Sequence, residues 1–151
     1  MKINCKRTNS ENEDFKKLVS FLDADLVIRD GDDFAFYSQF NKLDQIKHVV
    51  VAYELGKAVA CGAIKLYQPG VMEIKRMFVL PECRGRQIAS KVLLELEKWA
   101  SELSIEKCIL ETGTNQPEAI ALYQKNAYLI IPNYGQYEGV EASVCFEKML
   151  K

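Results

Sequence analysis

A short basic turn between an apolar segment and a helix-like segment is the part of this sequence that most clearly suggests chemistry. The turn runs from Leu80 to Ala89 and contains Arg84 and Arg86. A helix N-terminus presents unpaired N–H groups and a partial positive charge, which together attract an anion. The two arginines add full charges whose planar groups match phosphate oxygens. The turn therefore suits a phosphate group.

The turn alone does not identify a ligand, because many basic strand–turn–helix junctions bind nothing. The sequence has neither G-x-x-x-x-G-K-[ST] nor G-x-G-x-x-G after a strand, so P-loop and dinucleotide-binding readings lose their main support. Cys83 lies beside both arginines, where a thiol ionises more easily. A plain spacer residue is the favoured reading of this cysteine, and a reactive thiol is the alternative.

Charged residues and one tyrosine supply the remaining candidates. Glu73, Lys75 and Arg76 interrupt a strand that would be nearly all apolar if both of its faces were covered. Two readings stay open: pairing with neighbouring strands on a partly open face, or a strand that borders a wet cleft with Glu73 as a proton acceptor. Tyr123 follows a strand end, where ligands of open α/β sheets bind. It reads as a buried aromatic or as an acid that faces the cleft.

The apolar periodicity predicts the elements that must position these residues. Strands are expected at residues 2–7, 48–54, 57–67, 71–80, 107–111, 128–131 and 142–149, and helices after a capping box at Ser10–Glu13, at 88–103 and at 116–125. Residues 23–46 read as irregular, with a short helix around 34–40. Leu55-Gly56 reads as a hairpin turn. This order predicts a mixed sheet with helices on its faces.

The composition indicates one ordinary globular domain over residues 1–151, with 48% hydrophobic and 27% charged residues. A net charge of −1 argues against a general nucleic-acid binder. No apolar run approaches the ~18 residues that span a bilayer, so we expect no membrane partner. Five scattered cysteines without a C-x-x-C pair favour a reducing cytoplasm over a disulfide framework or a zinc site, and no metal is expected.

Four ordered motifs resemble one known family. The chain reads Glu73-Ile-Lys-Arg-Met-Phe-Val79, then Arg84-Gly-Arg-Gln-Ile-Ala89, Leu110-Glu-Thr-Gly113 and Ala119-Ile-Ala-Leu-Tyr123. These segments are similar to those of the GNAT superfamily of acyl-CoA-dependent N-acyltransferases, over roughly residues 48–150. The resemblance implies a mixed, mostly antiparallel α/β sheet of about six or seven strands with helices on both faces. It also implies acetyl-CoA as co-substrate, and homodimers are common in the superfamily.

The resemblance carries over to individual residues. Cofactor contacts are implied for Met77, Phe78, Val79, Arg84, Gly85, Arg86, Gln87, Ile88, Ala89, Asn115 or Gln116, and Tyr123. The pyrophosphate would lie on backbone N–H groups of the turn, and pantetheine would run along the strand like an added β-strand. Gln87 departs from the family's middle glycine of the loop, which is tolerable if its φ stays negative.

The resemblance implies acetyl transfer to a primary amine of a small molecule or peptide. Glu73, directly or through a water, would take the amine's proton, and Tyr123 would protonate the departing thiolate. The alternative is a non-catalytic acyl-CoA-binding or sensing module on the same fold. With one histidine, His48, and no G-x-S-x-G, a Ser-His hydrolase is not expected. A Cys83 acyl-enzyme lacks a base nearby in sequence.

The acceptor pocket has two sets of candidate residues. Tyr134 and Tyr137 lie in the loop that follows the expected strand at 128–131. The acidic set is Asp23, Asp25, Asp30, Asp32 and Asp33. An acidic, aromatic pocket would suit a small cationic amine, and a solvated acidic surface is the equal alternative.

Overall fold

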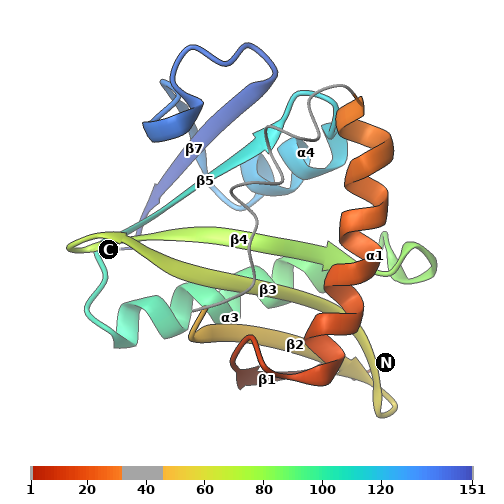
Figure 1. Ribbon diagram of the computed structural model, residues 1–151. Helices are drawn as coiled ribbons and strands as arrows, with labels where there is room; N and C mark the ends of the chain where they lie inside the picture. The colour runs from red at the N-terminus through yellow and green to blue at the C-terminus, as the bar shows by residue number, and fades with distance from the viewer. Residues whose placement is uncertain (1, 32–45, 151) are drawn as a thin grey trace.

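A seven-stranded sheet forms the centre of the molecule in the computed structural model, which describes residues 2–31 and 46–150 (Figure 1). The strand order is β1-β2-β3-β4-β5-β7-β6. The strands are β1 Asn4–Thr8, β2 His48–Glu54, β3 Lys57–Gln68, β4 Val71–Val79, β5 Lys107–Gly113, β6 Leu129–Ile131 and β7 Ser143–Met149. Among the strand pairs of the described residues, β4–β5 alone is parallel. The expected mixed, mostly antiparallel sheet is confirmed.

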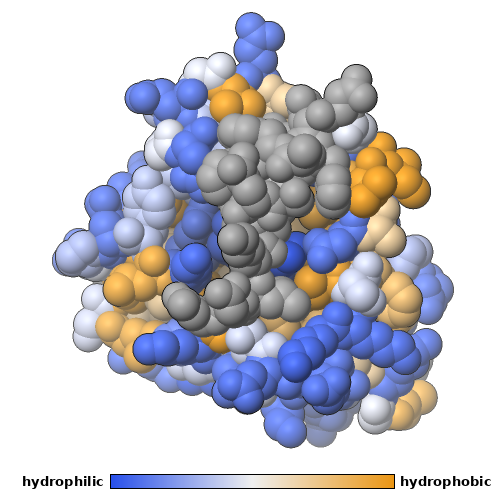
Figure 2. Space-filling model, in the orientation of Figure 1, coloured by the Kyte–Doolittle hydropathy of each residue, from blue (hydrophilic) through white to orange (hydrophobic). Residues whose placement is uncertain are grey.

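Helices cover both faces of this sheet. Helix α1 (Glu13–Asp30) lies in front of the sheet in Figure 1, and α3 (Ile88–Glu102) lies behind it. Helix α4 (Pro117–Lys125) sits near the start of α3, where Asn126 donates a hydrogen bond to Ser90 Oγ at 3.1 Å. The outer side of the first half of α1 is largely hydrophilic (Figure 2). The helices thus leave the middle of β2 and the stretch Val59–Ile64 of β3 buried on both faces, which explains their apolar runs.

The two central strands separate after a short contact. Strands β4 and β5 pair only through Val71–Glu73 and Lys107–Ile109. Beyond Glu73, β4 stays paired with β3, while β5 stays paired with β7 as far as Gly113. The sheet therefore opens as a V between β4 and β5 (Figure 1). On that side β4 has no further strand partner in the described part of the chain.

A β-bulge bends β4 beside this opening. Cys61 pairs with Phe78 and Ala63 pairs with Lys75, so two residues of β4 face the single residue Gly62. A Cβ on Gly62 would come within 2.4 Å of Met77 Sδ and 2.9 Å of Leu96 Cδ1. Glycine at this position lets the bulge pack closely on α3.

The first helix differs from its prediction in two ways. Its N-cap is Asn12, whose side chain accepts a hydrogen bond from the Phe15 N–H at 2.9 Å, so the expected capping box at Ser10 is wrong. The helix also continues to Asp30, through a segment expected to be irregular, because Leu22 and Leu26 pack against the core. The helix expected around 34–40 lies outside the described residues.

Smaller predictions of the fold are confirmed. The hairpin turn falls at Leu55-Gly56. Strand and helix ends elsewhere agree within about two residues, as is usual for element boundaries. In residues 2–31 and 46–150, no helix is both long enough and apolar enough to cross a bilayer.

The cap at Asn12 gives a direct test of how α1 begins. Asn12→Ala removes the oxygen that satisfies the Phe15 N–H and should cost about 1 kcal/mol of folding free energy, which is a drop of roughly 2–4 °C in Tm. Ser10→Ala is the matched control and should leave Tm within about 1 °C. Thermal unfolding by circular dichroism measures both. A larger loss for Ser10→Ala would contradict this assignment of the cap.

Candidate active site

A cleft of about 550 Å³ fills the opening between β4 and β5. Its walls come from β4, the turn before α3, the end of β5, α4 and the C-terminal half of α1. A cleft of this size, at the point where two parallel strands part, is the usual place for a ligand in an α/β protein. The described residues around the cleft form three parts. They are a basic end at the turn before α3, a middle formed by the backbone of β4, and a floor that carries charged side chains.

The basic end is formed by the turn and the start of α3. Arg84, Gly85, Gln87, Ile88 and Ala89 all line the cleft. Within residues 2–31 and 46–150, no side chain caps the start of α3, and its first turn contains no acidic residue. Its first N–H groups are therefore not neutralised locally, which suits an anion. The Arg84 Nε donates to the Val79 carbonyl oxygen at 2.9 Å, which ties the turn to the end of β4.

The backbone at Gln87 corrects one expectation. Its φ is +62°, so the condition under which a side chain would be tolerable here, a negative φ, is not met. Gly85 before it has a φ of +79°. A left-handed backbone conformation costs a residue with a side chain roughly 1–2 kcal/mol. A glycine would therefore adopt the backbone conformation of position 87 with less strain. The turn keeps its shape despite this cost.

Two other expected cofactor residues turn away from the cleft. Arg86 forms an ion pair with Glu54 at the end of β2, and it is not among the lining residues. The Asn115 side chain donates to the Arg29 carbonyl oxygen at 3.1 Å, whereas Gln116 lines the cleft. Of the two candidates at the start of α4, Gln116 is the one that faces the ligand space.

The middle of the cleft is the unpaired side of β4. Met77, Phe78 and Val79 line it as expected. Tyr123 projects from α4 into the same space and is only 6% exposed. Its ring lies 5.7 Å from that of Tyr128 and 5.9 Å from that of Phe146, centroid to centroid. Burial raises the pKa of Tyr123 above its usual range, so its hydroxyl keeps its proton at neutral pH. Tyr123 is thus a buried aromatic residue that also lines the cleft, and its role as an acid stays a prediction.

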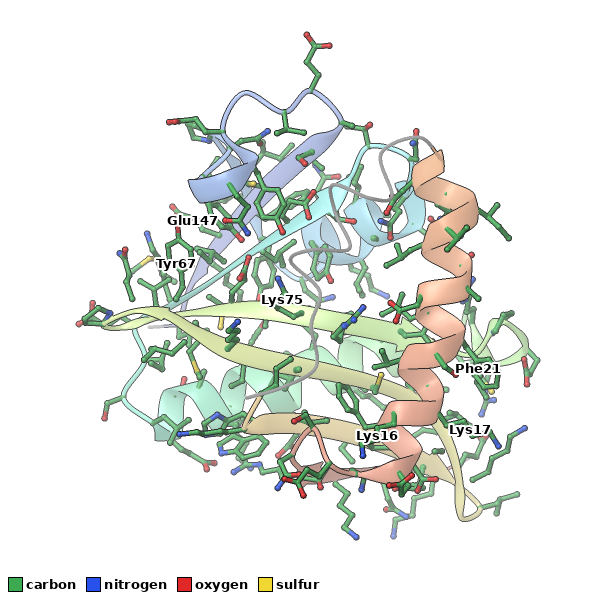
Figure 3. The ribbon with its side chains drawn as sticks, viewed as in Figure 1. Lys16, Lys17, Phe21, Tyr67, Lys75 and Glu147 are labelled. Carbon is green, nitrogen blue, oxygen red and sulfur yellow. The ribbon has the colours of Figure 1, made fainter. Side chains whose placement is uncertain are left out.

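The floor of the cleft holds Glu73 in a network of contacts. The Tyr134 hydroxyl donates to Glu73 Oε2 at 2.6 Å. Lys75 Nζ lies 3.7 Å from Glu73 Oε1, and both side chains are about nine-tenths buried. Lys75 lies between β4 and β5 in Figure 3. Burial lowers the pKa of Lys75, and the Glu73 charge opposes that shift.

A second carboxylate in the floor was not among the expected site residues. Glu111 on β5 lines the cleft, and its Oε2 is buried with no hydrogen-bond partner among the described residues. Burial raises the pKa of Glu111 to about 7, while a hydrogen bond from Ser143 and the charge of Lys75 oppose the rise. The Leu110–Gly113 motif contains Glu111, but the motif alone does not reveal that its carboxylate faces an open cleft.

Aromatic rings close the floor on one side. Tyr134 packs edge-on against Tyr67 at 5.3 Å and against Tyr137 at 5.8 Å, between ring centroids. Tyr137 lines the cleft, whereas Tyr134 reaches the floor through its bond to Glu73. The two tyrosines expected near the acceptor therefore lie beside the carboxylates.

The acidic set on α1 has a mostly structural environment. Asp23 pairs with Arg76 at 2.8 Å, and Asp25 pairs with Arg29 at 3.0 Å. Arg29 also binds Glu118 at 2.6 Å, which connects the end of α1 to α4 across the cleft. Asp30 is buried and lines the cleft. Asp32 and Asp33 lie outside the described residues.

The remaining candidates have ordinary surroundings. Cys83 is buried at the end of the 3-10 turn Pro81–Cys83. His48 packs edge-on against Trp99, with ring centroids 4.8 Å apart, in agreement with a structural role. Across residues 2–31 and 46–150, no three His, Cys, Asp or Glu side chains gather as metal ligands would.

The comparisons with known proteins identify the family. The model of the acetyltransferase (GNAT) family matches residues 12–128, so the chain belongs to this family of N-acetyltransferases. An IAA acetyltransferase of Azospirillum brasilense is 38% identical over 102 residues, which are 67% of each chain. The N-acetyltransferase YjgM of Escherichia coli is 37% identical over 78 residues, which are 50% of this chain and 46% of that protein.

Solved structures share the whole fold. A Klebsiella pneumoniae protein assigned to the acyl-CoA N-acyltransferases has a TM-score of 0.83 and 30% identity, and the match covers 99% of this chain and 98% of that one. The PaiA N-acetyltransferase of Thermoplasma acidophilum, solved in complex with coenzyme A, has a TM-score of 0.73 at 16% identity, over 99% of both chains. At 16% identity, the match to the PaiA enzyme shows a shared fold and nothing beyond it.

The raised pKa of Glu111 predicts how stability depends on pH. The folded-state pKa of about 7 lies above the ordinary value of 4.5, so the folded protein binds this proton more tightly than the unfolded chain. The stabilisation from the bound proton is complete below about pH 4.5 and is lost as pH rises through 7. At pH 8 the charged carboxyl then costs on the order of 2–3 kcal/mol.

Glu111→Gln should therefore melt several degrees above the unmodified protein at pH 8, and the difference should shrink or reverse at pH 5. Glu118→Gln is the matched control, because Glu118 is more exposed and its ion pair with Arg29 lowers its pKa. It should bring no gain at pH 8. Calorimetry at both pH values makes the measurement, and parallel pH profiles for Glu111→Gln and the unmodified protein would contradict the raised pKa.

Proposed function

We propose that this GNAT-family enzyme moves the acetyl group of acetyl-CoA directly to a primary amine of a small molecule or peptide, in a ternary complex. The observation that carries the proposal is the cleft itself. It joins an uncapped helix N-terminus, an unpaired strand edge and a buried acidic floor in one continuous space. These three parts match the phosphate, the amide-containing arm and the reacting end of an acyl-CoA beside an amine.

The cofactor would lie along the cleft from the turn to the floor. Backbone N–H groups between Arg84 and Ala89 would bind the pyrophosphate, with Gln116 nearby. Pantetheine would pair with β4 at Met77–Val79, since backbone groups that lack a strand partner favour an added strand. The thioester would then reach the region between Tyr123 and the carboxylates.

The chemistry begins with the amine, because an ammonium near pKa 10 has no lone pair for attack. A carboxylate of the floor takes the proton; Glu73 is the candidate from the motif. The neutral amine attacks the thioester carbonyl, and an N–H of β4 near Phe78 or Val79 stabilises the oxyanion. Tyr123, which keeps its proton at neutral pH, then protonates the sulfur of coenzyme A.

The surroundings of the floor favour a cationic acceptor. Buried carboxylates beside tyrosine rings attract an amine both by charge and by cation–π contact.

All five cysteines are free, which supports the expected cytoplasmic location.

Cofactor binding is the first test. Millimolar acetyl-CoA or coenzyme A should raise Tm by about 5–10 °C, because a ligand at 100 times its Kd adds about 2.7 kcal/mol. ATP is the control and should bring little change.

Thiol release is then followed with a panel of amino acids, polyamines, arylalkylamines and a short peptide. IAA is added because the Azospirillum relative is named for it. A shift without thiol release from any acceptor would favour a binding module, and no shift would overturn the proposal.

Tyr123→Phe tests the general acid. The variant keeps the ring and its packing but loses the proton donor, so kcat should fall by about 100-fold while the acetyl-CoA thermal shift is kept. Tyr128→Phe is the control, since its hydroxyl donates a buried hydrogen bond to Glu97 of α3 at 2.9 Å and does not line the cleft. That change should affect stability more than turnover. An unchanged kcat in Tyr123→Phe would remove Tyr123 from this role.

A further inference from the structure

Two carboxylates share the floor of the cleft, and the strand register places them on one face of the sheet. Glu73 pairs with Ile109 in the parallel β4–β5 contact. Glu111 lies two residues beyond Ile109, so its side chain projects from the same face as that of Glu73. Both line the cleft at the point where the strands part. Either could accept a proton from the acceptor by position alone.

The oxygens of Glu73 are already occupied. Oε2 accepts the 2.6 Å hydrogen bond from Tyr134, and Oε1 faces Lys75 Nζ at 3.7 Å. The Glu73 side chain is buried between these two partners. An incoming ammonium would therefore share this carboxylate with the lysine and the tyrosine. This arrangement suits a group that holds its neighbours in place.

Glu111 has the opposite arrangement. Its Oε2 is buried and has no hydrogen-bond donor within the described part of the chain. A buried carboxylate oxygen without a donor is unfavourable, and such groups in folded proteins usually have a ligand, a water or a catalytic role. Because Glu111 lines the cleft, the N–H of an acceptor can supply the missing donor.

We infer that Glu111 receives the ammonium group of the acceptor and takes its proton, and that Glu73 is a positioning residue that holds Lys75 and Tyr134. This inference rests on the acetyl transfer proposed above. It replaces Glu73 by Glu111 as the proton acceptor, and it locates the acceptor nitrogen at Glu111 Oε2.

The protons balance in this assignment. One of the three ammonium protons passes to Glu111 and then to solvent, which frees the lone pair on nitrogen. The C–N bond forms at the thioester carbon and the C–S bond breaks. Tyr123 gives its proton to the departing sulfur, and the second proton lost by nitrogen returns to Tyr123. The third stays on the amide nitrogen.

The charged and titratable groups around Glu111 come from each element packed against it. They are Glu73 and Lys75 of β4, Asp30 of α1, Tyr123 of α4, Tyr137 of the 3-10 turn Gly135–Tyr137, and Cys145 of β7, which pairs with Glu111. Burial is the largest cause of the raised pKa of about 7, and Lys75 limits it. A base with a pKa near the working pH combines a large charged fraction with a strong drive to take the proton.

The experiment compares Glu111→Gln with Glu73→Gln, using acetyl-CoA and the best acceptor of the amine panel, from pH 5.5 to 9. Glu111→Gln should lower kcat/KM by about 100-fold or more and abolish the acidic limb near pH 7. Glu73→Gln should keep that limb and lose less than about tenfold. Both variants should keep the acetyl-CoA thermal shift. In Glu111→Ala, added formate should restore part of the turnover, and in Glu73→Ala it should not.

The outcomes separate this inference from the function on which it rests. Turnover in the unmodified protein together with near-normal kcat/KM in Glu111→Gln would overturn the inference and leave acetyl transfer standing. Loss of the acidic limb in Glu73→Gln, or formate rescue of Glu73→Ala alone, would also overturn it in favour of Glu73. If the unmodified protein binds no acetyl-CoA, the proposed function fails, and the inference fails with it.

Discussion

The short parallel contact between β4 and β5 is the constraint on which the rest of the site depends. Three residue pairs join the two halves of the sheet, and the strands part after Glu73. Had the pairing continued, the backbone of Met77–Val79 would be satisfied by β5 and no cleft would form. The bulge opposite Gly62 bends β4 at the same place, and the close fit of Gly62 on α3 fixes where the bend occurs. The divergence therefore creates the ligand space and a strand edge that can bind a ligand.

The free-energy cost of burying a charge explains how the charged residues around the cleft are paired. A buried charge needs a partner, and the buried Arg76 binds Asp23; the half-buried Arg29 likewise binds both Asp25 and Glu118. These pairs connect α1 to β4 and to α4, so they also set the width of the cleft. Glu111 Oε2 is the contrast, since no described residue donates to it. A buried carboxylate oxygen that borders a cleft and lacks a donor points to a functional role.

Much of the fold could be predicted because its elements have strong local patterns. Strands at 48–54 and 57–67 are continuous apolar runs with a Leu-Gly turn between them, and the structure has them within one residue. The first helix was harder to predict. Its second half carries acidic residues, which suggest irregular chain, whereas in the structure Leu22 and Leu26 pack on the core and favour the helix. The positive φ of Gln87 could not be predicted for a related reason. A left-handed φ at a non-glycine residue is set by the surrounding turn.

The sequence by itself determined the order of the elements, the basic turn before a helix, and the presence of Glu73 and Tyr123 in motifs of an acyltransferase. These are properties of residue type and spacing along the chain. The tertiary structure decided which side chains face the same space. It turned Arg86 to Glu54 and Asn115 to the α1 backbone, and it brought Glu111 to the floor beside Glu73. Whether a carboxylate is free to accept a proton depends on neighbours distant in sequence, such as Tyr134, and spacing along the chain carries no record of them.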